Sequence, residues 1–300
     1  MSGLSQRLAD FGYATGWRMT RRLPRSFGST AFALGADLAA RRGGGSVKQL
    51  RANLARVVPQ ADETELDELV RRAMRSYARY WFETFRLPAM DLAEVAKQVT
   101  VSGAENVDAA LAEGNGAVMT LPHSGNWDIA GVWLASYAGT FTTVAERLEP
   151  ESLYRRFVAF RESLGFEIVP LTGDSAAMRL LLRRLRENKL VVLLGDRDLT
   201  ASGVPVRFFG ERTTLPPGPA RLAATTGAAL LPTGCWFTED GWEIRIHPRI
   251  RVTARAEVPA ATQALADVFA GDIAGHPADW HMLQPFWPAD TAAPTLEEAS

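Results

Sequence analysis

The chain has 300 residues, of which 47% are hydrophobic and 22% are charged, and this composition excludes a wholly disordered or collagen-like protein. Its single cysteine, Cys235, excludes an internal disulfide framework and any cysteine-cluster metal site, and favours a cytoplasmic location. No run of 18 apolar residues occurs, and the first residues lack the apolar core of a signal peptide, so we expect neither a membrane span nor a signal peptide.

The net charge of −1 hides an uneven distribution of charge along the chain. Residues 1–56 contain ten basic and two acidic residues, a net charge of +8, interleaved with aromatic residues such as Trp17 and Phe27. Such a mixture is typical of segments that lie in a membrane interface, so we predict that 1–56 is a basic amphipathic helical region that associates with an anionic membrane surface. Two alternatives stay open: a basic helix packed on an acidic body, and a nucleic-acid arm. The aromatic residues favour the membrane, and we expect no nucleic-acid partner.

In chain order, helical spacing of apolar residues predicts one or two helices over residues 4–42, broken by Gly43-Gly44-Gly45, and further helices over 46–56 and 62–86. From residue 100 onward, short apolar runs alternate with helical patterns. The predicted strands are 116–121, 140–145, 166–171, 189–194, 228–233 and 242–250. The predicted helices among them are 104–113, 127–137, 151–164, 174–187 and 217–226.

Strands that alternate with helices predict an α/β fold with a mostly parallel central sheet flanked by helices. Residues 204–210 resemble an edge strand that ends in a turn. Because we find neither an internal repeat nor a linker, we expect residues 1–300 to form a single α/β domain in which 1–56 is the membrane-associated helical region.

The sharpest local signal is the sequence Leu-Pro-His-Ser-Gly-Asn-Trp-Asp over residues 121–128, which follows a predicted strand and precedes a predicted helix. It lies at the carboxyl end of a strand, where open α/β sheets place their ligands. Asn126 is a candidate N-cap, and Asp128 falls in the first helical turn, where the helix dipole favours an ionised carboxylate. We expect the turn to bring Asp128 beside one ring nitrogen of His123, so that the other nitrogen acts as a general base.

The alternative interpretation is that His123 merely ends a strand and Asp128 merely caps a helix. The position after an apolar strand favours catalysis. No Gly-x-Ser-x-Gly nucleophile elbow occurs and Cys235 lies in an apolar strand context, so direct attack by a substrate hydroxyl is favoured over a covalent enzyme intermediate. No ligand spacing supports a metal site, and we expect neither a metal nor a cofactor.

Charged residues follow two other predicted strands and therefore point to the same edge of the sheet. They are Glu146-Arg147 and Gly195-Asp196-Arg197-Asp198. In the predicted helix 151–164, Arg161 falls within the apolar arc, and a buried guanidinium needs an anionic partner. That partner is either a carboxylate in a structural ion pair or a phosphate of a ligand.

Taken together, these blocks resemble the lysophospholipid and lipid A-type acyltransferase superfamily, whose mark is His-x4-Asp. The resemblance covers about residues 5–288. It is carried, in order, by His123 with Asp128, Glu146-Arg147, Arg161 with Gly165, Gly195-Asp196-Arg197-Asp198, and residues 206–210, 217–223 and 227–229. Within the superfamily the chain is most similar to the actinobacterial phosphatidylinositol mannoside acyltransferases, through residues 196–200, 202–204 and 276–285. That group usually has glutamate where this chain has Asp196.

The resemblance implies transfer of a long acyl chain, typically palmitoyl, from acyl-CoA to a mannose hydroxyl of phosphatidylinositol mono- or dimannoside, at the cytoplasmic face of the cell membrane. His123 would deprotonate the hydroxyl, and Asp128 or Asp196 would orient His123; the resemblance does not say which. The acyl-CoA ligands would be Arg161, Ser202 and Arg221, and the substrate-binding residues Glu146, Arg147 and Arg197. Two other functions stay open: a lipid A-type enzyme that uses acyl carrier protein, and a non-catalytic membrane lipid-binding protein, which the intact His123 and Asp128 disfavour.

Overall fold

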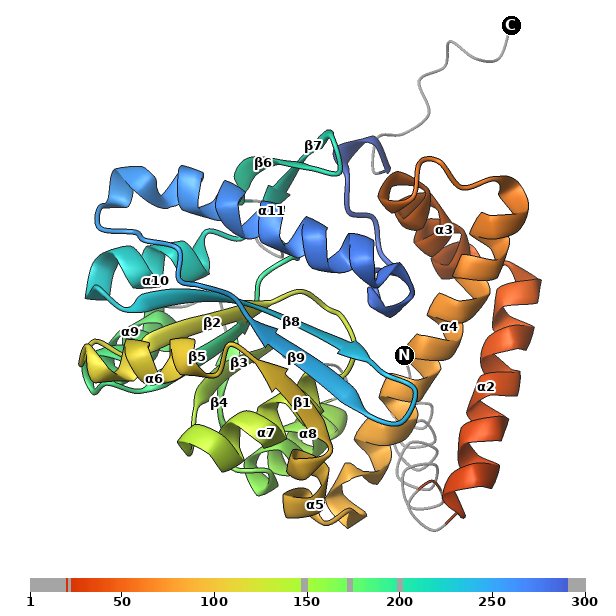
Figure 1. The fold of residues 1–300 in the computed structure, drawn as a ribbon, viewed down its shortest axis with the longest axis horizontal. Coiled ribbons are helices and arrows are strands. Elements are labelled where there is room, and N and C mark those ends of the chain that lie inside the picture. The colour runs from red at the N-terminus through yellow and green to blue at the C-terminus, as the bar shows by residue number, and fades with distance from the viewer. Residues whose placement is uncertain (1–19, 21–22, 147–150, 172–174, 199–201, 291–300) are drawn as a thin grey trace, which may run out of the picture.

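A central seven-stranded sheet organises the computed structural model, which describes residues 20, 23–146, 151–171, 175–198 and 202–290 (Figure 1). Its strands are β1 (Val99–Ser102), β2 (Ala117–Leu121), β3 (Thr142–Glu146), β4 (Glu167–Leu171), β5 (Leu190–Leu194), β8 (Ala229–Phe237) and β9 (Trp242–Ile246). They lie in the order β1-β9-β8-β2-β5-β3-β4, and all neighbours are parallel except β8 and β9. The predicted α/β fold with a mostly parallel sheet is confirmed.

Helices cover both faces of this sheet. One face carries α5 (Leu92–Lys97), α6 (Glu105–Ala112), α7 (Trp127–Ala138) and α8 (Glu151–Ser163), and the other carries α9 (Ser175–Arg186), α10 (Gly218–Thr226) and α11 (Val258–Gly275). In β2, Met119 and Leu121 join the apolar cluster on the first face and Val118 joins the cluster on the second. Because successive strand side chains point to opposite faces, a strand covered on both sides is apolar throughout, as its sequence indicated.

The structure also contains elements that the sequence pattern did not predict. They are β1, α5, α11 and β7 (Glu211–Leu215), which forms a separate hairpin with β6 (Val204–Phe208). The predicted edge strand 204–210 therefore pairs with β7 rather than with the central sheet. Phe209 and Gly210 both have positive φ, 49° and 81°, the conformation that a tight two-residue hairpin requires.

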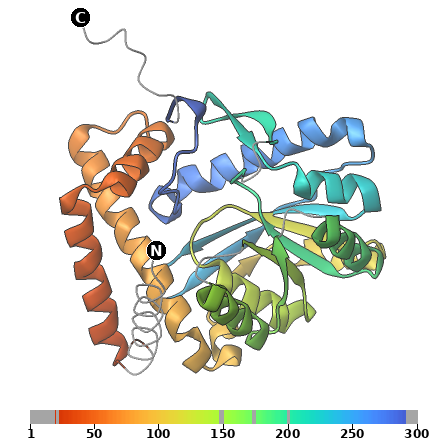
Figure 2. The ribbon, with the colours of Figure 1, turned by 180° about the vertical axis from the view of Figure 1, so that it is seen from behind.

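Three N-terminal helices form a further layer beside the sheet (Figures 1 and 2). They are α2 (Arg25–Arg42), α3 (Gly45–Val57) and α4 (Glu63–Arg86), and they share an apolar cluster of their own. Gly43 ends α2 in the left-handed conformation with φ 61°, so the predicted glycine break is confirmed. Residues 4–19, 21 and 22 of the predicted region 4–42 lie outside the described residues.

The helix α2 packs on α4 through one face and exposes another. Gly28 lies against the ring of Phe82, and Asp37 forms ion pairs with Arg71 and Arg75 of α4. The side chains of Phe27, Leu34 and Leu38 are 63%, 64% and 48% exposed. In the described part of the chain, no helix combines the length and the apolar character that a membrane span needs.

Candidate active site

The loop between β2 and α7 carries the motif that the sequence singled out. Asn126 caps α7, because its side chain accepts a hydrogen bond from the backbone N–H of Ile129 at 3.1 Å. Gly125 has φ 58°, and a Cβ there would lie 2.8 Å from the carbonyl oxygen of Cys235 in β8. Only glycine combines this conformation with this close approach, so the loop lies directly on the sheet edge. The predicted N-cap is confirmed.

The imidazole of His123 is bound by Asp196, which follows the neighbouring strand β5. The Nδ1 atom of His123 lies 2.6 Å from Oδ1 of Asp196, and the backbone N–H of His123 donates to Oδ2 at 2.9 Å. Asp196 is fully buried, while the side chain of His123 is 22% exposed. Since Nδ1 is held by the carboxylate, Nε2 is the ring nitrogen left for chemistry.

Asp196 is held in its ionised form. Burial alone would raise the pKa of the Asp196 carboxyl, but the nearby charge of His123 and hydrogen bonds from His123 and Trp280 outweigh burial and lower it. The indole Nε1–H of Trp280 donates to Oδ2 at 3.1 Å, so both carboxylate oxygens have donors. An ionised carboxylate on Nδ1 selects the tautomer in which Nε2 carries a free lone pair, as a general base requires.

Asp128 does not lie beside a ring nitrogen of His123, although the motif predicted that it would. Its buried carboxylate instead accepts hydrogen bonds from Nε of Arg161 in α8 at 2.8 Å and from the hydroxyl of Tyr80 in α4 at 3.2 Å. Asp196 reaches His123 because β2 and β5 are neighbours in the sheet, which their separation along the chain concealed. The expectation that Asp128 contacts a ring nitrogen is therefore corrected, and the open choice between the two carboxylates falls on Asp196.

Arg161 lies in the structural ion pair that the sequence left open as one of two alternatives. Burial would lower the pKa of the Arg161 guanidinium, but the charge of Asp128, together with Tyr80 and the hydrogen bonds to both, outweighs burial and raises it. Burial, followed by the charge of Asp128, raises the pKa of the Tyr80 hydroxyl well above its ordinary range, so this phenol stays a neutral donor. The contact of Arg161 with a phosphate of acyl-CoA stays a prediction.

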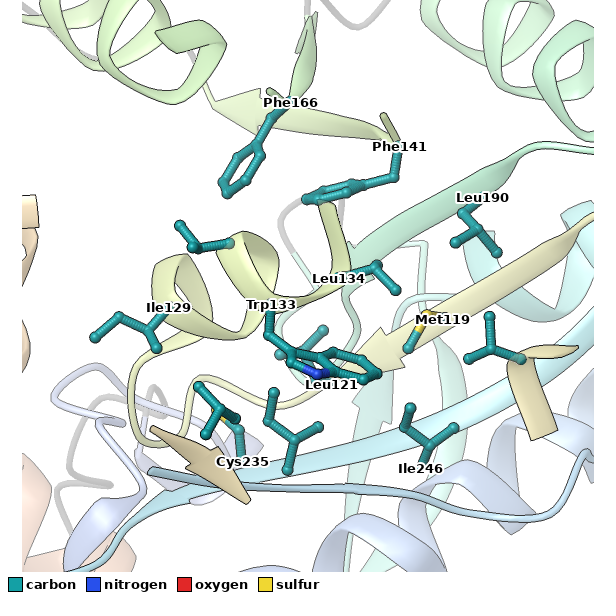
Figure 3. Close-up of a cluster of buried hydrophobic side chains, with 14 of the residues drawn as sticks. Met119, Leu121, Ile129, Trp133, Leu134, Phe141, Phe166, Leu190, Cys235 and Ile246 are labelled. Atoms are coloured by element: carbon teal, nitrogen blue, oxygen red, sulfur yellow. The ribbon is translucent and has the colours of Figure 1, made fainter. Parts of the chain in front are cut away.

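A largely apolar cavity begins at these polar groups and continues between α7 and the sheet. His123, Asp128, Arg161 and Arg197 line its polar part. The apolar lining comes from β2, α7 and their neighbours and includes Met119, Leu121, Gly131, Trp133, Leu134, Phe141, Phe166, Val192, Leu194 and Ile244. Figure 3 shows Trp133 lying between α7 and the sheet near Leu121. A cavity of this kind suits a long hydrocarbon chain whose reactive end lies at His123.

Of the other predicted site residues, only some line this cavity. Arg197 is part of its lining, whereas Ser202 and Arg221 are exposed and do not belong to the lining that the described residues form. Arg147 lies outside the described residues, and Glu146 is described only as the last residue of β3. Among the residues that the structure describes, no cluster of three or more histidine, cysteine or acidic side chains could hold a metal ion.

Several buried polar residues around the motif were missed by sequence reasoning. Glu83 of α4 is buried, and its Oε2 accepts from Nδ2 of Asn126 at 2.9 Å and from Nε1 of Trp242 at 2.8 Å. Glu83 therefore fixes the side chain of Asn126, the N-cap of α7. The signal that could have found Glu83 is an acidic side chain at a buried position of an amphipathic helix. The helical pattern over 62–86 accounts for the segment without it, so Glu83 did not stand out.

Acid is expected to destabilise the fold through His281. Burial and the nearby His123 lower the pKa of the His281 imidazole to about 3. Between pH 6.5 and pH 3 the unfolded chain binds a proton at His281 that the folded chain does not. The free energy of unfolding should therefore decrease as the pH is lowered through this window, by up to about 1.4 kcal/mol per pH unit. Urea denaturation at several pH values should show a shallower pH dependence in His281→Gln, and equal slopes would contradict the assignment.

Comparisons with known proteins find relatives over most of the chain. The sequence profile of the bacterial lipid A biosynthesis acyltransferases matches residues 4–288. A protein of Mycolicibacterium smegmatis named phosphatidylinositol mannoside acyltransferase is 54% identical over 96% of this chain and 94% of its own length. A protein of the same name from Mycobacterium tuberculosis is 53% identical over 96% of this chain and 92% of its own length. A lipid A biosynthesis acyltransferase of Haemophilus influenzae is 21% identical over 70% of this chain.

Proposed function

Because the chain belongs to the bacterial lipid A biosynthesis acyltransferase family, we propose that it is an acyltransferase that acylates phosphatidylinositol mannosides. The mycobacterial relatives that bear this name support the acceptor, since they are 54% and 53% identical over 96% of the chain. We propose that the donor is a long-chain acyl-CoA, with palmitoyl as the transferred group, and that the acceptor atom is a mannose hydroxyl of the mono- or dimannoside.

The observation that carries this proposal is the His123–Asp196 pair at the polar end of an apolar cavity. Nε2 of His123 takes the proton of the mannose hydroxyl while the hydroxyl oxygen attacks the carbonyl carbon of the thioester. The carbon–oxygen bond forms, the carbon–sulfur bond breaks, and the proton passes from His123 to the leaving thiolate of CoA. Asp196 stays ionised throughout and balances the charge of the imidazolium.

The acyl chain occupies the apolar part of the cavity in this proposal. Arg197 on the cavity lining is a cation for the acceptor's headgroup. Glu146 and Arg147 are the further candidates for binding the acceptor. Ser202 and Arg221 are the further candidates for CoA contacts. Arg161 contributes by holding Asp128 and by closing the cavity wall.

A valine at Gly131 is expected to shorten the acyl chain that the enzyme accepts. Gly131 lies in α7 on the cavity, and a Cβ there would come within 2.5 Å of Phe166 Cζ and 3.1 Å of Phe141 Cζ. The added side chain takes up cavity space, so the ratio of palmitoyl-CoA to decanoyl-CoA turnover should fall about tenfold. The matched control is Gly271→Val in α11, where nothing lies within 4 Å. An unchanged ratio in a folded Gly131→Val enzyme would remove the cavity as the acyl site.

We propose that the protein works as a peripheral protein at the cytoplasmic face of the membrane, where acyl-CoA and a lipid acceptor meet. The exposed face of α2 supports this placement: Phe27, Leu34 and Leu38 are spaced so that they share one side of the helix. The exposed Arg41 and Arg42 end the same helix, and cations near anionic lipid contribute about 1 kcal/mol each.

Replacing Phe27, Leu34 and Leu38 together with serine is expected to reduce binding to vesicles that contain anionic lipid. Burial of large apolar side chains contributes about 1.5–3 kcal/mol each, and this part of the binding persists when salt screens the charges. Sedimentation with vesicles at low and high salt measures both parts. The matched control replaces Tyr137 and Met178, which are 44% and 40% exposed on α7 and α9. Equal binding by the triple variant, the control and the wild type would contradict the role of α2.

Mass spectrometry of the product tests the reaction itself. The purified protein is incubated with mannosylated phosphatidylinositol and either palmitoyl-CoA or palmitoyl-acyl carrier protein, beside a His123→Ala variant. We expect the acceptor to gain one palmitoyl group with palmitoyl-CoA and the wild-type protein only. Transfer from the carrier protein alone would favour the lipid A-type donor, and absence of transfer from both would favour a lipid-binding protein without catalysis.

A further inference from the structure

The segment around Trp280 pairs with the loop that carries His123. The backbone N–H of His281 donates to the carbonyl oxygen of His123 at 2.8 Å, and the N–H of Gly125 donates to the carbonyl oxygen of Asp279 at 2.9 Å. Ser124 and Trp280 thereby form an antiparallel bridge. Two strand-like hydrogen bonds therefore fix the backbone on both sides of Ser124 to residues near the end of the described chain.

The side chain of Trp280 reaches the other half of the catalytic pair. Its ring is fully buried, and its Nε1–H donates to Oδ2 of Asp196 at 3.1 Å. The same oxygen accepts the backbone N–H of His123, so two donors on Oδ2 leave Oδ1 for the imidazole. Rotation of an aspartate carboxylate about its last bond has only broad preferences, so these donors fix the plane of the carboxylate and aim its other oxygen at Nδ1.

The segment that carries Trp280 is itself held firmly. The carboxylate of Asp279 accepts from the hydroxyl of Ser76 at 2.6 Å and from the backbone N–H of Phe237 at 2.9 Å. The ring of Trp280 packs with Phe286 and Trp287, with ring centroids 5.3 and 6.2 Å away. Trp280 therefore approaches Asp196 from a support that joins α4, β8 and an aromatic cluster, and its indole has little freedom to move.

We propose that Trp280 is a positioning residue for the reaction: its indole N–H fixes the carboxylate of Asp196 so that Oδ1 meets the imidazole of His123. This inference rests on the proposed function, in which His123 is the general base. Trp280 touches neither the acyl donor nor the acceptor in this account, and it acts only through Asp196. Loss of its N–H should therefore alter the His123–Asp196 hydrogen bond and lower turnover without weakening substrate binding.

Trp280→Phe tests the inference, because phenylalanine keeps most of the buried ring and removes the donor. Trp287→Phe is the matched control: Trp287 is also buried in the same aromatic cluster, and its Nε1 has no hydrogen-bond partner among the described residues. Both variants lose a similar amount of packing. We expect kcat to fall about three- to tenfold in Trp280→Phe, the effect of one net hydrogen bond, with KM unchanged, and we expect neither to change in Trp287→Phe.

A second measurement needs no substrate. A short Nδ1–H···O⁻ hydrogen bond gives its proton an NMR resonance far downfield, which His123→Ala assigns by deleting it. We expect this resonance to move or to broaden beyond detection in Trp280→Phe and to stay in place in Trp287→Phe. An unchanged resonance in Trp280→Phe, or an equal change in both variants, would overturn the inference. Because this readout involves no acyl transfer, failure of the proposed function would leave its result intact.

Discussion

Replacing His123 with alanine is expected to lower kcat for acyl transfer by about 10²- to 10⁴-fold, the range for losing a general base. The fold should survive, because the side chain is 22% exposed and its backbone hydrogen bonds to Asp196 and His281 do not depend on the imidazole. Turnover of palmitoyl-CoA with mannosylated phosphatidylinositol measures the loss. Asp196→Asn should lower kcat within a similar range, because it removes the charge that stabilises the imidazolium.

The chain supplies a matched control for this variant. His247 is also 22% exposed, and its Nε2 lies 2.9 Å from the carboxylate of the buried Asp272, yet it does not line the cavity. His247→Ala removes an equivalent histidine–aspartate contact and should leave kcat within a few-fold of wild type. If His123→Ala and His247→Ala have similar activities, His123 is not the base.

Replacing Arg161 with methionine is expected to lower the free energy of unfolding by about 3 to 5 kcal/mol, the cost of breaking a buried ion pair. Asp128 has a side chain that is 1% exposed, and the substitution removes the guanidinium that lies 2.8 Å from its carboxylate. Methionine retains most of the aliphatic volume, so the loss reports the uncompensated charge more than the packing. Urea denaturation followed by tryptophan fluorescence measures the change.

Two companion variants separate this effect from a general loss of the helix. Arg155→Met breaks an exposed pair with Glu151 in the same helix and should cost at most about 1 kcal/mol. The double variant Arg161→Met with Asp128→Asn removes both charges and should recover part of the stability. A single Arg161→Met variant with wild-type stability but weaker, salt-sensitive binding of acyl-CoA would instead support a phosphate ligand.

The fold was largely predictable because its strands and helices have simple patterns. Apolar runs such as 117–121 and 190–194, each buried on both faces, identify a parallel sheet before any contact is known. The four-residue strand β1 and the five-residue β7 are too short for a clear alternation, and their pairing partners determine them. The helix α11 buries a single face, but alanine, threonine and aspartate lie on that face and further alanines lie outside it, so its amphipathic signal is weak.

The residues of the site were predictable from the sequence, but the contacts between their side chains were not. The sequence indicated His123, Asp128, Asp196 and Arg161 as one group, and the structure brings all four to one cavity or its edge. Which carboxylate meets the imidazole depends on β5 lying next to β2, and strand order is not written in local spacing. Trp280 gave no sign of its contact with Asp196, because a single tryptophan near a chain end has no periodicity to reveal a partner.

The hydrogen bonds between residues 123–125 and 279–281 also have a consequence for synthesis on the ribosome. The motif emerges about 160 residues before its partner segment, a delay of roughly ten to thirty seconds at ordinary elongation rates. During that time the nascent chain already contains His123 and, later, Asp196, but not the residues that complete their surroundings. An interrupted chain would therefore carry His123 and Asp196 without the residues that fix their geometry, and in the proposed mechanism only a chain that extends past Trp280 and His281 could be active.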